Sequence, residues 1–233
     1  MPPRAPLPLS RDRVLAVGVA LADRHGLGAV TMRRLAEELG CEAMSIYHHV
    51  PGKAALLEGL VDAVVAEVGV VWHDPTYELD AGDWRDVVGR RCLAARQVMA
   101  AHPWARDLVA VQAATPPSSF VVFESLVGTL RTAGFGTELA HRAVHAFGAM
   151  VLGFTHELFE PRADDPGTSE QDLTTMAAAF PSLTWLGGPE LHAQDGALSR
   201  CDTQAEFEFT LGLVLDGLQR CRDAAVDDGP RTG

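Results

Sequence analysis

Residues 31–53, TMRRLAEELGCEAMSIYHHVPGK, decide the fold that we expect for the start of this chain. Thr31 is a residue type that caps the N-terminus of a helix, and apolar residues follow it at helical spacing. Gly40 can end that helix in the left-handed backbone region. A second short helix is expected over 43–50, and Pro51 stops it. Two short helices joined by a turn that contains glycine predict a helix-turn-helix.

The second helix of this pair leaves an unusual set of side chains for solvent or a partner. Ile46 and Val50 lie four residues apart and are expected to face the core. The remaining side chains are small, hydroxyl, aromatic and imidazole groups, which suit the major groove of DNA. The expected contacts from this helix are Ala43, Met44, Ser45, Tyr47, His48 and His49.

The run from Thr31 to Leu57 resembles the DNA-binding domain of the TetR family of one-component bacterial regulators. The joint spacing of the matching residues carries the resemblance, because each match is weak by itself. An accidental glycine turn within a helical bundle is the alternative reading. The matches are Thr31, Arg33, Leu35-Ala36, Leu39-Gly40, Ile46-Tyr47, His49-Val50, Lys53 and Ala55-Leu56-Leu57.

The resemblance implies a division of labour among the DNA contacts. Arg33 is expected to read bases, whereas Tyr47, His49 and Lys53 are expected to hold the phosphate backbone. Lys53 is the only lysine in the chain. It stands at the N-terminal end of a predicted helix, where a positive charge opposes the helix dipole, and this favours a role in binding an external anion. Thr31 and Arg34 complete the set of expected contacts.

Charge is distributed unevenly along the chain. The formal net charge of the 233 residues is −12. Residues 1–53 hold seven basic and five acidic side chains, whereas the rest hold 12 basic and 26 acidic ones. A mildly basic head on a strongly acidic body is expected when only one end meets phosphates.

Composition excludes several other classes of protein. No apolar run approaches the roughly 18 residues that a membrane span needs, and the N-terminus lacks the apolar segment of a signal peptide. We therefore expect a cytoplasmic protein with no membrane partner. The four cysteines form no C-x-x-C pair, which argues against a zinc site or structural disulfide.

The expected fold class is all-α, with an N-terminal three-helix helix-turn-helix DNA-binding domain and a helical C-terminal domain for ligand binding and dimerisation. The domains are predicted at 1–52, preceded by a disordered arm at 1–9, and at 53–226, with a disordered tail at 227–233. The expected helices of the chain are 11–25, 31–39, 43–50, 53–71, 84–101, 104–113, 120–133, 137–160 and 203–224, with a weaker one at 170–180 and an irregular segment at 186–202.

The body also resembles the tetracycline-repressor-like branch of the family, in HPWARDL, LRTAGF and HAFGAMVLGF. This resemblance implies a homodimer in which the helices at 137–160 and 203–224 pair with their symmetry mates. Gly148 and Gly153 would let the backbones approach closely. The expected dimer residues are Ala140, Val144, Phe147, Val151, Phe154, Phe207, Leu211, Val214 and Leu218.

A small-molecule inducer is the other partner that the resemblance implies. The positions that hold the metal–drug chelate in the tetracycline repressor fall near Val109, Leu126 and Ala149, which are apolar here, and Glu157 alone cannot make a metal site. We therefore expect an apolar inducer, with no metal and no cofactor. The expected ligand contacts are Trp104, Gln112, Phe120, Phe123, Leu126, Phe147, Val151 and His156.

No sequence motif supports an enzyme. The chain has no G-x-S-x-G, Walker or dinucleotide-binding pattern, and His156-Glu157 lacks the second histidine of a zinc protease because Glu160 takes its place. His141 and His145 have metal-binding spacing, but a solvated or interface pair is favoured. We expect a repressor that a small molecule releases from a palindromic operator. The alternative is an all-α enzyme or binding protein whose helix-turn-helix is structural.

Overall fold

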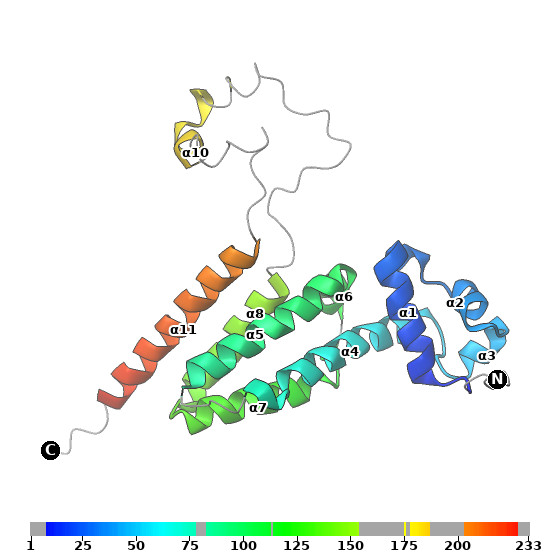
Figure 1. Ribbon diagram of the computed structural model, residues 1–233, viewed down its shortest axis with the longest axis horizontal. Coiled ribbons are helices and arrows are strands. Elements are labelled where there is room, and N and C mark those ends of the chain that lie inside the picture. Colours follow the sequence, from blue (N-terminus) through cyan, green and yellow to red (C-terminus); the bar gives the residue numbers. More distant parts are fainter. Residues whose placement is uncertain are drawn as a thin grey trace. The chain divides into compact units, whose positions relative to one another are not determined.

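The structure is a computed structural model that describes residues 8–77, 83–112, 114–153, 175, 178–186 and 203–227. Over these residues the fold is all-α, as predicted, and contains no strand (Figure 1). None of the described helices combines the length and apolar character that a membrane crossing requires. The helices are α1 (Arg11–His25), α2 (Met32–Leu39), α3 (Ala43–Tyr47), α4 (Lys53–Trp72), α5 (Trp84–Ala101), α6 (Pro103–Val111), α7 (Ser119–Thr132), α8 (Thr137–Gly153), α10 (Pro181–Leu186) and α11 (Thr203–Asp227), with short 3-10 turns at Leu27–Ala29 and Pro75–Tyr77.

The chain divides into two compact units that do not coincide with the predicted domains. Residues 1–155 and 209–233 form one unit, and residues 156–208 form the other. The helix-turn-helix and most of the body therefore belong to the same unit. The domain boundary at 52 stays a prediction about function rather than a division visible in the packing.

The helix ends follow the local sequence. The side-chain oxygens of Ser10, Thr31 and Asp83 accept hydrogen bonds from backbone N–H groups in the first turns of α1, α2 and α5, at 3.2, 3.2 and 3.0 Å. Gly40 ends α2 with φ 66° and ψ 36°. The backbone N–H of Cys41 then donates to Ala36 O at 3.0 Å, which closes the helix end that glycine favours.

Several predicted helix boundaries differ from the observed ones by one to three residues, and two of the differences have a clear local cause. The second helix of the motif ends at Tyr47 rather than at residue 50, because the N–H groups of His49 and Val50 both donate to Ile46 O and close a turn. The sixth helix begins at Pro103, one residue before the predicted start. Proline is favourable at the first helical position because its missing N–H has no partner to lose there.

Other predicted segments lie partly or wholly outside the described residues. The helix expected over 137–160 is described to Gly153. The arm at 1–7, the segment at 187–202 and most of 170–180 are not described.

Helix α4 is central to the larger unit and packs against α1, α5, α6 and α7. Its crossing with α1 is close. A Cβ atom on Gly18 would lie 2.7 Å from Leu60 Cδ2, and one on Gly59 would lie 2.7 Å from Leu15 Cδ2. Because Gly18 and Gly59 have no side chains, α1 and α4 can approach each other closely at these two positions. The helix-turn-helix therefore packs directly against the helix that runs into the body.

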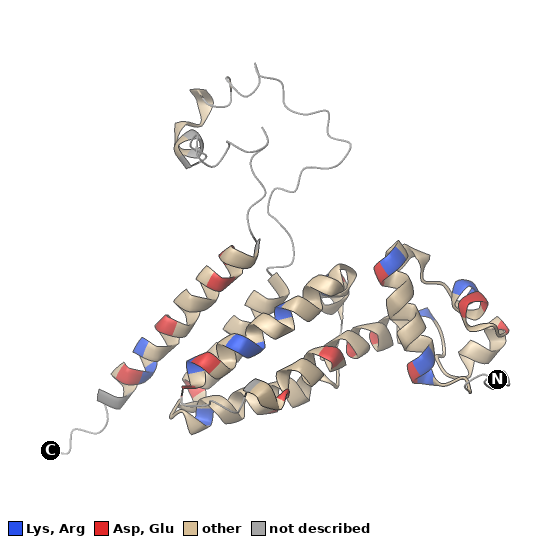
Figure 2. Cartoon of the chain, viewed as in Figure 1, with Lys and Arg blue, Asp and Glu red and all other residues tan. Residues whose placement is uncertain are grey.

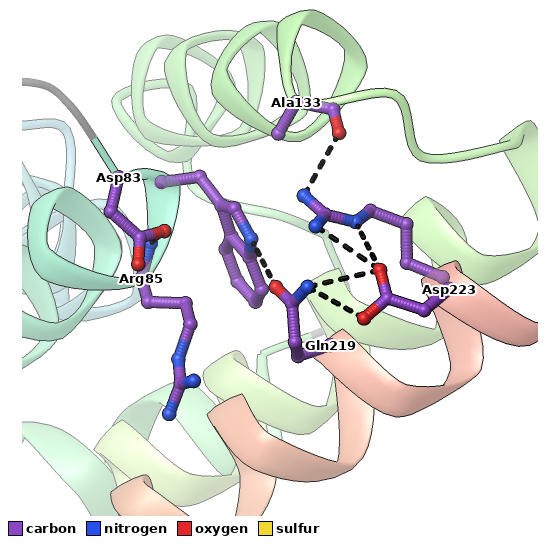
Figure 3. A network of polar contacts seen from close by, with 7 residues as sticks. Asp83, Arg85, Ala133, Gln219 and Asp223 are labelled. Atoms are coloured by element: carbon purple, nitrogen blue, oxygen red, sulfur yellow. Dashed lines mark hydrogen bonds and ion pairs between the residues drawn. The ribbon is translucent and has the colours of Figure 1, made fainter.

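The part of α11 that belongs to the larger unit is anchored by polar contacts (Figure 3). Trp84 Nε1 donates to Gln219 Oε1 at 3.0 Å, and Gln219 Nε2 donates to the Asp223 carboxylate at 2.9 Å. Arg222 Nη1 donates to Ala133 O at 3.2 Å. These bonds join α11 to α5 and to the turn after α7, and they fix which face of α11 stays exposed.

Candidate DNA interface and ligand cavity

The helix-turn-helix is held by a small apolar core on its inner side. Leu35 and Ile46 are fully buried, and Ala36 and Val50 are 5% and 1% exposed. These residues occupy the inward faces that the helical spacing predicted. The outward faces of α2 and α3 are therefore fixed in direction by packing beneath them.

The residues expected to contact DNA lie on this outer side or at its edge. Met44 and Tyr47 are 67% and 44% exposed, so both large side chains are accessible to a partner. The shortened α3 places His48 and His49 in the turn that follows it. The exposed members of the set are Thr31, Arg33, Met44, Tyr47, His48 and Lys53, and the half-buried members are Arg34, Ala43, Ser45 and His49.

Arg33 is available to an external partner. Its side chain is 89% exposed, and it forms an ion pair with Glu37, four residues along the same helix, at 3.5 Å. Exposed pairs of this kind contribute little stability, so exchange for a base or phosphate is inexpensive. The Thr31 hydroxyl caps α2, but it retains a proton that it can donate outward.

Lys53 is the first residue of α4 and follows Gly52, whose φ is 124°. Its side chain is exposed. Basic residues occur on α1 and α2 as well as at the start of α4, whereas the later part of α4 carries acidic ones (Figure 2). Helices α1 and α2 also carry acidic residues, so among the described residues 8–53 six basic side chains stand against five acidic ones, a small positive balance.

A cavity of about 360 Å³ lies within the body, between α4, α5, α6, α7 and α8. Among the described residues, no charged side chain lines it. Trp72, Gln112, Thr115 and Ser119 supply its polar groups. The other lining residues are Val65, Val68, Ala95, Met99, Val109, Ala114, Pro116, Val122, Phe123, Leu126, Val144, Phe147, Gly148, Val151 and Leu152. Such a lining suits an uncharged, largely apolar molecule.

Five of the residues expected to contact a ligand line this cavity, namely Gln112, Phe123, Leu126, Phe147 and Val151. Phe120 does not, and its side chain is 62% exposed. The cavity face of α7 is formed by residues 119, 122, 123 and 126, so Phe120 points about 100° away from it. His156 lies outside the described residues.

Trp104 is also absent from the cavity lining. Its indole N–H donates to Asp23 Oδ1 of α1 at 2.7 Å. Sequence reasoning placed Trp104 in the cavity because large aromatic side chains usually fill the space between helices. The cavity-lining residues Val65, Val68 and Trp72 of α4 were not predicted. A signal for them was present, because α4 is apolar on more than one face, and such a helix is usually covered on several sides.

His102, at the N-terminal end of α6, joins the body to the head. Its Nδ1 lies 2.8 Å from Asp23 Oδ1 on α1, and its Nε2 lies 3.2 Å from Glu67 Oε2 on α4. The residue is 8% exposed. Two carboxylate acceptors on one imidazole require both ring nitrogens to donate, which is the protonated state.

The pKa of His102 reflects these contacts. Burial alone would lower it, but the hydrogen bonds that the ring makes to Asp23 and Glu67 and the negative charges of the two carboxylates outweigh burial, so the pKa lies above the ordinary 6.5. Since α6 also reaches the cavity through Val109, this short helix touches the head at one end and the cavity towards the other.

A second hollow, of about 1010 Å³, lies beside the polar contacts of α11 and has a different character. Arg85, Arg91 and Arg222 line it together with hydroxyl and carboxylate groups. Its charged groups are engaged with the protein itself. Arg85 pairs with Asp216. Arg222 contacts Asp223, one of the contacts drawn in Figure 3. Of these two hollows, the smaller one is therefore the one with an apolar, uncharged lining among the described residues.

The two helices expected to form the dimer contact differ in what they expose. On α8, Ala140 and Phe147 are buried in the single chain, and Val144 and Val151 are half-buried. On α11, Leu211 and Leu218 are buried, as is Phe207, and Val214 is half-buried. Phe154 lies outside the described residues. The exposed apolar side chains of α11 are instead Phe209 and Leu213, at 65% and 56%.

His141 and His145 face solvent on α8, with ring centroids 4.6 Å apart in an edge-to-face arrangement. Within the described part of the chain, no group of three or more histidine, cysteine or acidic residues is arranged to hold a metal ion. The pair therefore contributes an exposed aromatic patch to this face of the helix.

Comparisons with known families cover both parts of the chain. Residues 14–60 match the family described as bacterial regulatory proteins, tetR family. Residues 75–222 match the family described as the tetracyclin repressor-like, C-terminal domain. Together, these matches include the helix-turn-helix and the helices that surround the cavity.

Individual proteins are similar over nearly the whole chain. The tetracycline repressor protein class C of Escherichia coli is 28% identical over 223 residues, which cover 92% of each chain. A possible TetR family regulator from Streptomyces coelicolor A3(2) is 32% identical, with a TM-score of 0.67 over 91% of this chain and 100% of the other. ActR from Streptomyces coelicolor in complex with actinorhodin is 27% identical, with a TM-score of 0.69 over 93% of this chain and 99% of the other.

Proposed function

Because the chain belongs to the TetR family of bacterial transcriptional regulators, we propose that it is a repressor that a small, mostly apolar molecule releases from a palindromic operator. It is a ligand-responsive regulator that binds DNA as a homodimer. The observation that carries the finer proposal is the apolar cavity of about 360 Å³ against α4, the helix that begins at the helix-turn-helix. The family consists of regulators, so the enzyme alternative is not favoured. The cytoplasm is the proposed location, and the DNA-binding role of the family supports it.

The DNA-facing surface consists of α2, α3 and the start of α4. Arg33 reads bases, because its side chain is 89% exposed and held by one weak ion pair. Tyr47, His49 and Lys53 hold the phosphate backbone around it. The other contacts come from Thr31, Arg34, Ala43, Met44, Ser45 and His48. Residues 1–52 act as the DNA-binding domain and residues 53–226 as the domain for ligand and dimer contacts.

The inducer occupies the cavity without a metal ion. Gln112 orients it, and Phe123, Leu126, Phe147 and Val151 form the apolar walls. Val109 and Leu126, which fall where the tetracycline repressor holds its chelate, line the cavity as apolar side chains. ActR binds actinorhodin in a solved complex, so a related fold holds an organic molecule.

Two helices transmit the occupancy of the cavity to the head. Helix α4 runs from Lys53 to Trp72 at the cavity, and α6 joins Val109 at the cavity to Asp23 of α1 through His102. A ligand that fits the cavity better when these helices are displaced shifts the population away from the DNA-binding arrangement. The two heads of the dimer then lose the spacing that successive major grooves require.

The homodimer pairs α8 and α11 with their symmetry mates. Phe209 and Leu213 of α11 project into the contact, since they are the large apolar side chains that this helix exposes. Val144 and Val151 add the half-buried surface of α8. The residues already buried in one chain, such as Phe147 and Leu211, support these helices from beneath.

The test is a mobility-shift titration with the DNA upstream of the protein's own gene, followed by release with a panel of apolar compounds and with magnesium-tetracycline. We expect retention of the DNA, release by apolar compounds, and no effect of EDTA. Arg33→Ala serves as the control that loses sequence preference without loss of fold. Release by the magnesium chelate alone, abolished by EDTA, would contradict the proposed ligand class. A failure to bind any such DNA would contradict the repressor assignment.

A further inference from the structure

Ser119, the first residue of α7, is a polar residue of the cavity wall whose hydroxyl is not used by the protein. The residue is 8% exposed. Its backbone N–H donates to Pro116 O at 2.9 Å, whereas its hydroxyl makes no hydrogen bond to any described residue. Its oxygen is not one of the described buried atoms that lack both a partner and accessible surface. Serine has a single heavy atom beyond Cβ, so the oxygen stays at the wall, where a small molecule can reach it.

The other reachable polar groups of the cavity lie on the same stretch of chain. Gln112 ends α6, and Thr115 stands in the connection between α6 and α7. Neither side chain makes a hydrogen bond to a described residue. The indole nitrogen of Trp72 is buried without accessible surface, so a ligand in the cavity cannot use it. The hydrogen-bonding side chains open to a ligand, among those described, therefore all come from residues 112–119.

The start of α7 does not offer a site for an anion, although the N-terminus of a helix usually favours one. Asp62 of α4 already occupies it, because its Oδ1 accepts a hydrogen bond from Ser118 N at 2.9 Å. The next N–H group, that of Ser119, is bonded to Pro116 O. A second negative charge beside Asp62 would be repelled. The polar group that this part of the wall can accept is therefore uncharged.

We propose that Ser119 selects the inducer by a hydrogen bond to a neutral hydroxyl group on it. A serine hydroxyl can donate and accept, and a hydroxyl on the ligand is the neutral group that satisfies it in either direction. This proposal rests on the function proposed above, in which the cavity binds the inducer. The rest of the molecule is apolar and contacts walls such as Phe123 and Phe147. The inducer is therefore an apolar alcohol or phenol rather than a hydrocarbon or a carboxylate.

A matched pair of probes tests the bond: 2-naphthol and 2-methylnaphthalene, which have the same ring system and nearly the same volume and differ by a hydroxyl in place of a methyl group. Dissociation constants are measured by equilibrium dialysis at pH 7 with the full-length wild type and Ser119→Ala. We expect the ratio of the two constants to shift about tenfold towards 2-methylnaphthalene in Ser119→Ala, the size of one hydrogen bond in a buried site. Ser118→Ala is the matched control, because this adjacent serine does not line the cavity and its hydroxyl caps no helix.

The wild type gives a second readout that does not depend on the folding of the variant. A cavity without a reachable polar group favours the methyl compound, because moving a hydroxyl from water into an apolar site without a hydrogen bond costs free energy. We expect the wild type to bind 2-naphthol at least as tightly as 2-methylnaphthalene. Tighter binding of 2-methylnaphthalene by the wild type would overturn the proposal.

The outcomes separate this inference from the function on which it rests. If neither probe binds the wild type, the proposed ligand class is wrong and the inference is overturned with it. If both probes bind, but the wild type and Ser119→Ala show the same ratio of constants, the role of Ser119 is wrong while the apolar cavity stands. If the ratio shifts as expected and 2-naphthol does not release operator DNA in a mobility-shift assay, the hydroxyl site stands and the proposed induction is wrong.

Discussion

The head and the cavity region use the same kind of helix for opposite purposes. Around the helix-turn-helix, large and charged side chains such as Arg33 and Tyr47 face outward, over a compact apolar core. Around the cavity, side chains such as Phe147 and Leu126 face inward and still leave about 360 Å³ unfilled. A binding surface needs well-packed residues beneath it to hold its side chains in place. A cavity, in contrast, lowers the stability of the fold because packing contacts are missing, and it leaves room for a ligand. Substitutions in the cavity wall should therefore lower the free energy of unfolding, whereas substitutions on the outer surface of the head should change DNA binding and leave stability unchanged.

The largest effect is expected from Phe147→Ala in the cavity wall. Phe147 is 1% exposed, and its loss enlarges a hollow that the surrounding helices already fail to close. We expect the free energy of unfolding to fall by about 3–5 kcal/mol, measured by urea denaturation. Phe120→Ala is the control, since that side chain is 62% exposed and should change stability by less than about 0.5 kcal/mol. Equal losses in the two variants would mean that the cavity wall is not where we place it.

The next effect is expected where the two regions meet, at the crossing of α1 and α4. Gly18→Val would place a Cβ atom 2.7 Å from Leu60 Cδ2, and Leu60 is fully buried. Overpacking of this kind should cost about 1–3 kcal/mol of unfolding free energy. Gly28→Val, whose added Cβ has no atom within 4 Å, should cost less in the same thermal melt. A melt that ranks the two variants the other way would contradict the close crossing.

Sequence alone predicted the head better than the cavity, for a physical reason. The cap at Thr31 and the left-handed Gly40 depend on contacts within a few residues, and both are present in the structure. Whether Phe120 or Phe123 faces the cavity depends on the rotation of α7 against distant helices. No local pattern distinguishes those two phenylalanines, because both lie in the same apolar run.

The same argument applies to the tryptophans. The sequence placed Trp104 in the cavity, but its N–H is taken by Asp23, a residue 81 positions away. Trp72 was overlooked because it closes a helix that reads as uniformly apolar, and only the fold shows that its donor is unpaired. Contacts between residues that lie far apart in the sequence, such as Trp104 and Asp23, cannot be predicted from a single sequence.

The DNA surface should respond to substitution without loss of stability. Arg33→Ala should lower specific binding by about 1–3 kcal/mol and reduce base discrimination, because a base contact is removed. Fluorescence anisotropy with operator and unrelated DNA separates the two effects. Arg33→Ala should melt like the wild type, in contrast to Phe147→Ala.

Lys53→Ala should weaken binding to all sequences alike, because we propose that this side chain contacts the phosphate backbone. The slope of log affinity against log salt should flatten by about one unit. A loss confined to the operator sequence would assign Lys53 to base reading. An unchanged slope would remove it from the interface.

The smallest effect concerns pH and the bond between the two regions. The pKa of His102 is raised above 6.5, because the carboxylates of Asp23 and Glu67 outweigh the effect of burial. The stability that this group contributes is therefore fully present below the pKa of the unfolded chain, and it is lost as pH rises through the higher pKa of the folded chain. We expect the difference in melting temperature between the wild type and His102→Gln to be larger at pH 6 than at pH 8.5. Glutamine keeps a hydrogen-bond donor but carries no charge. The difference in melting temperature between the wild type and His102→Gln at each pH therefore cancels the effects of all other titrating groups. A difference that stays constant over this range would mean that His102 is neutral in the folded protein and that one carboxylate contact, rather than two, joins the body to the head.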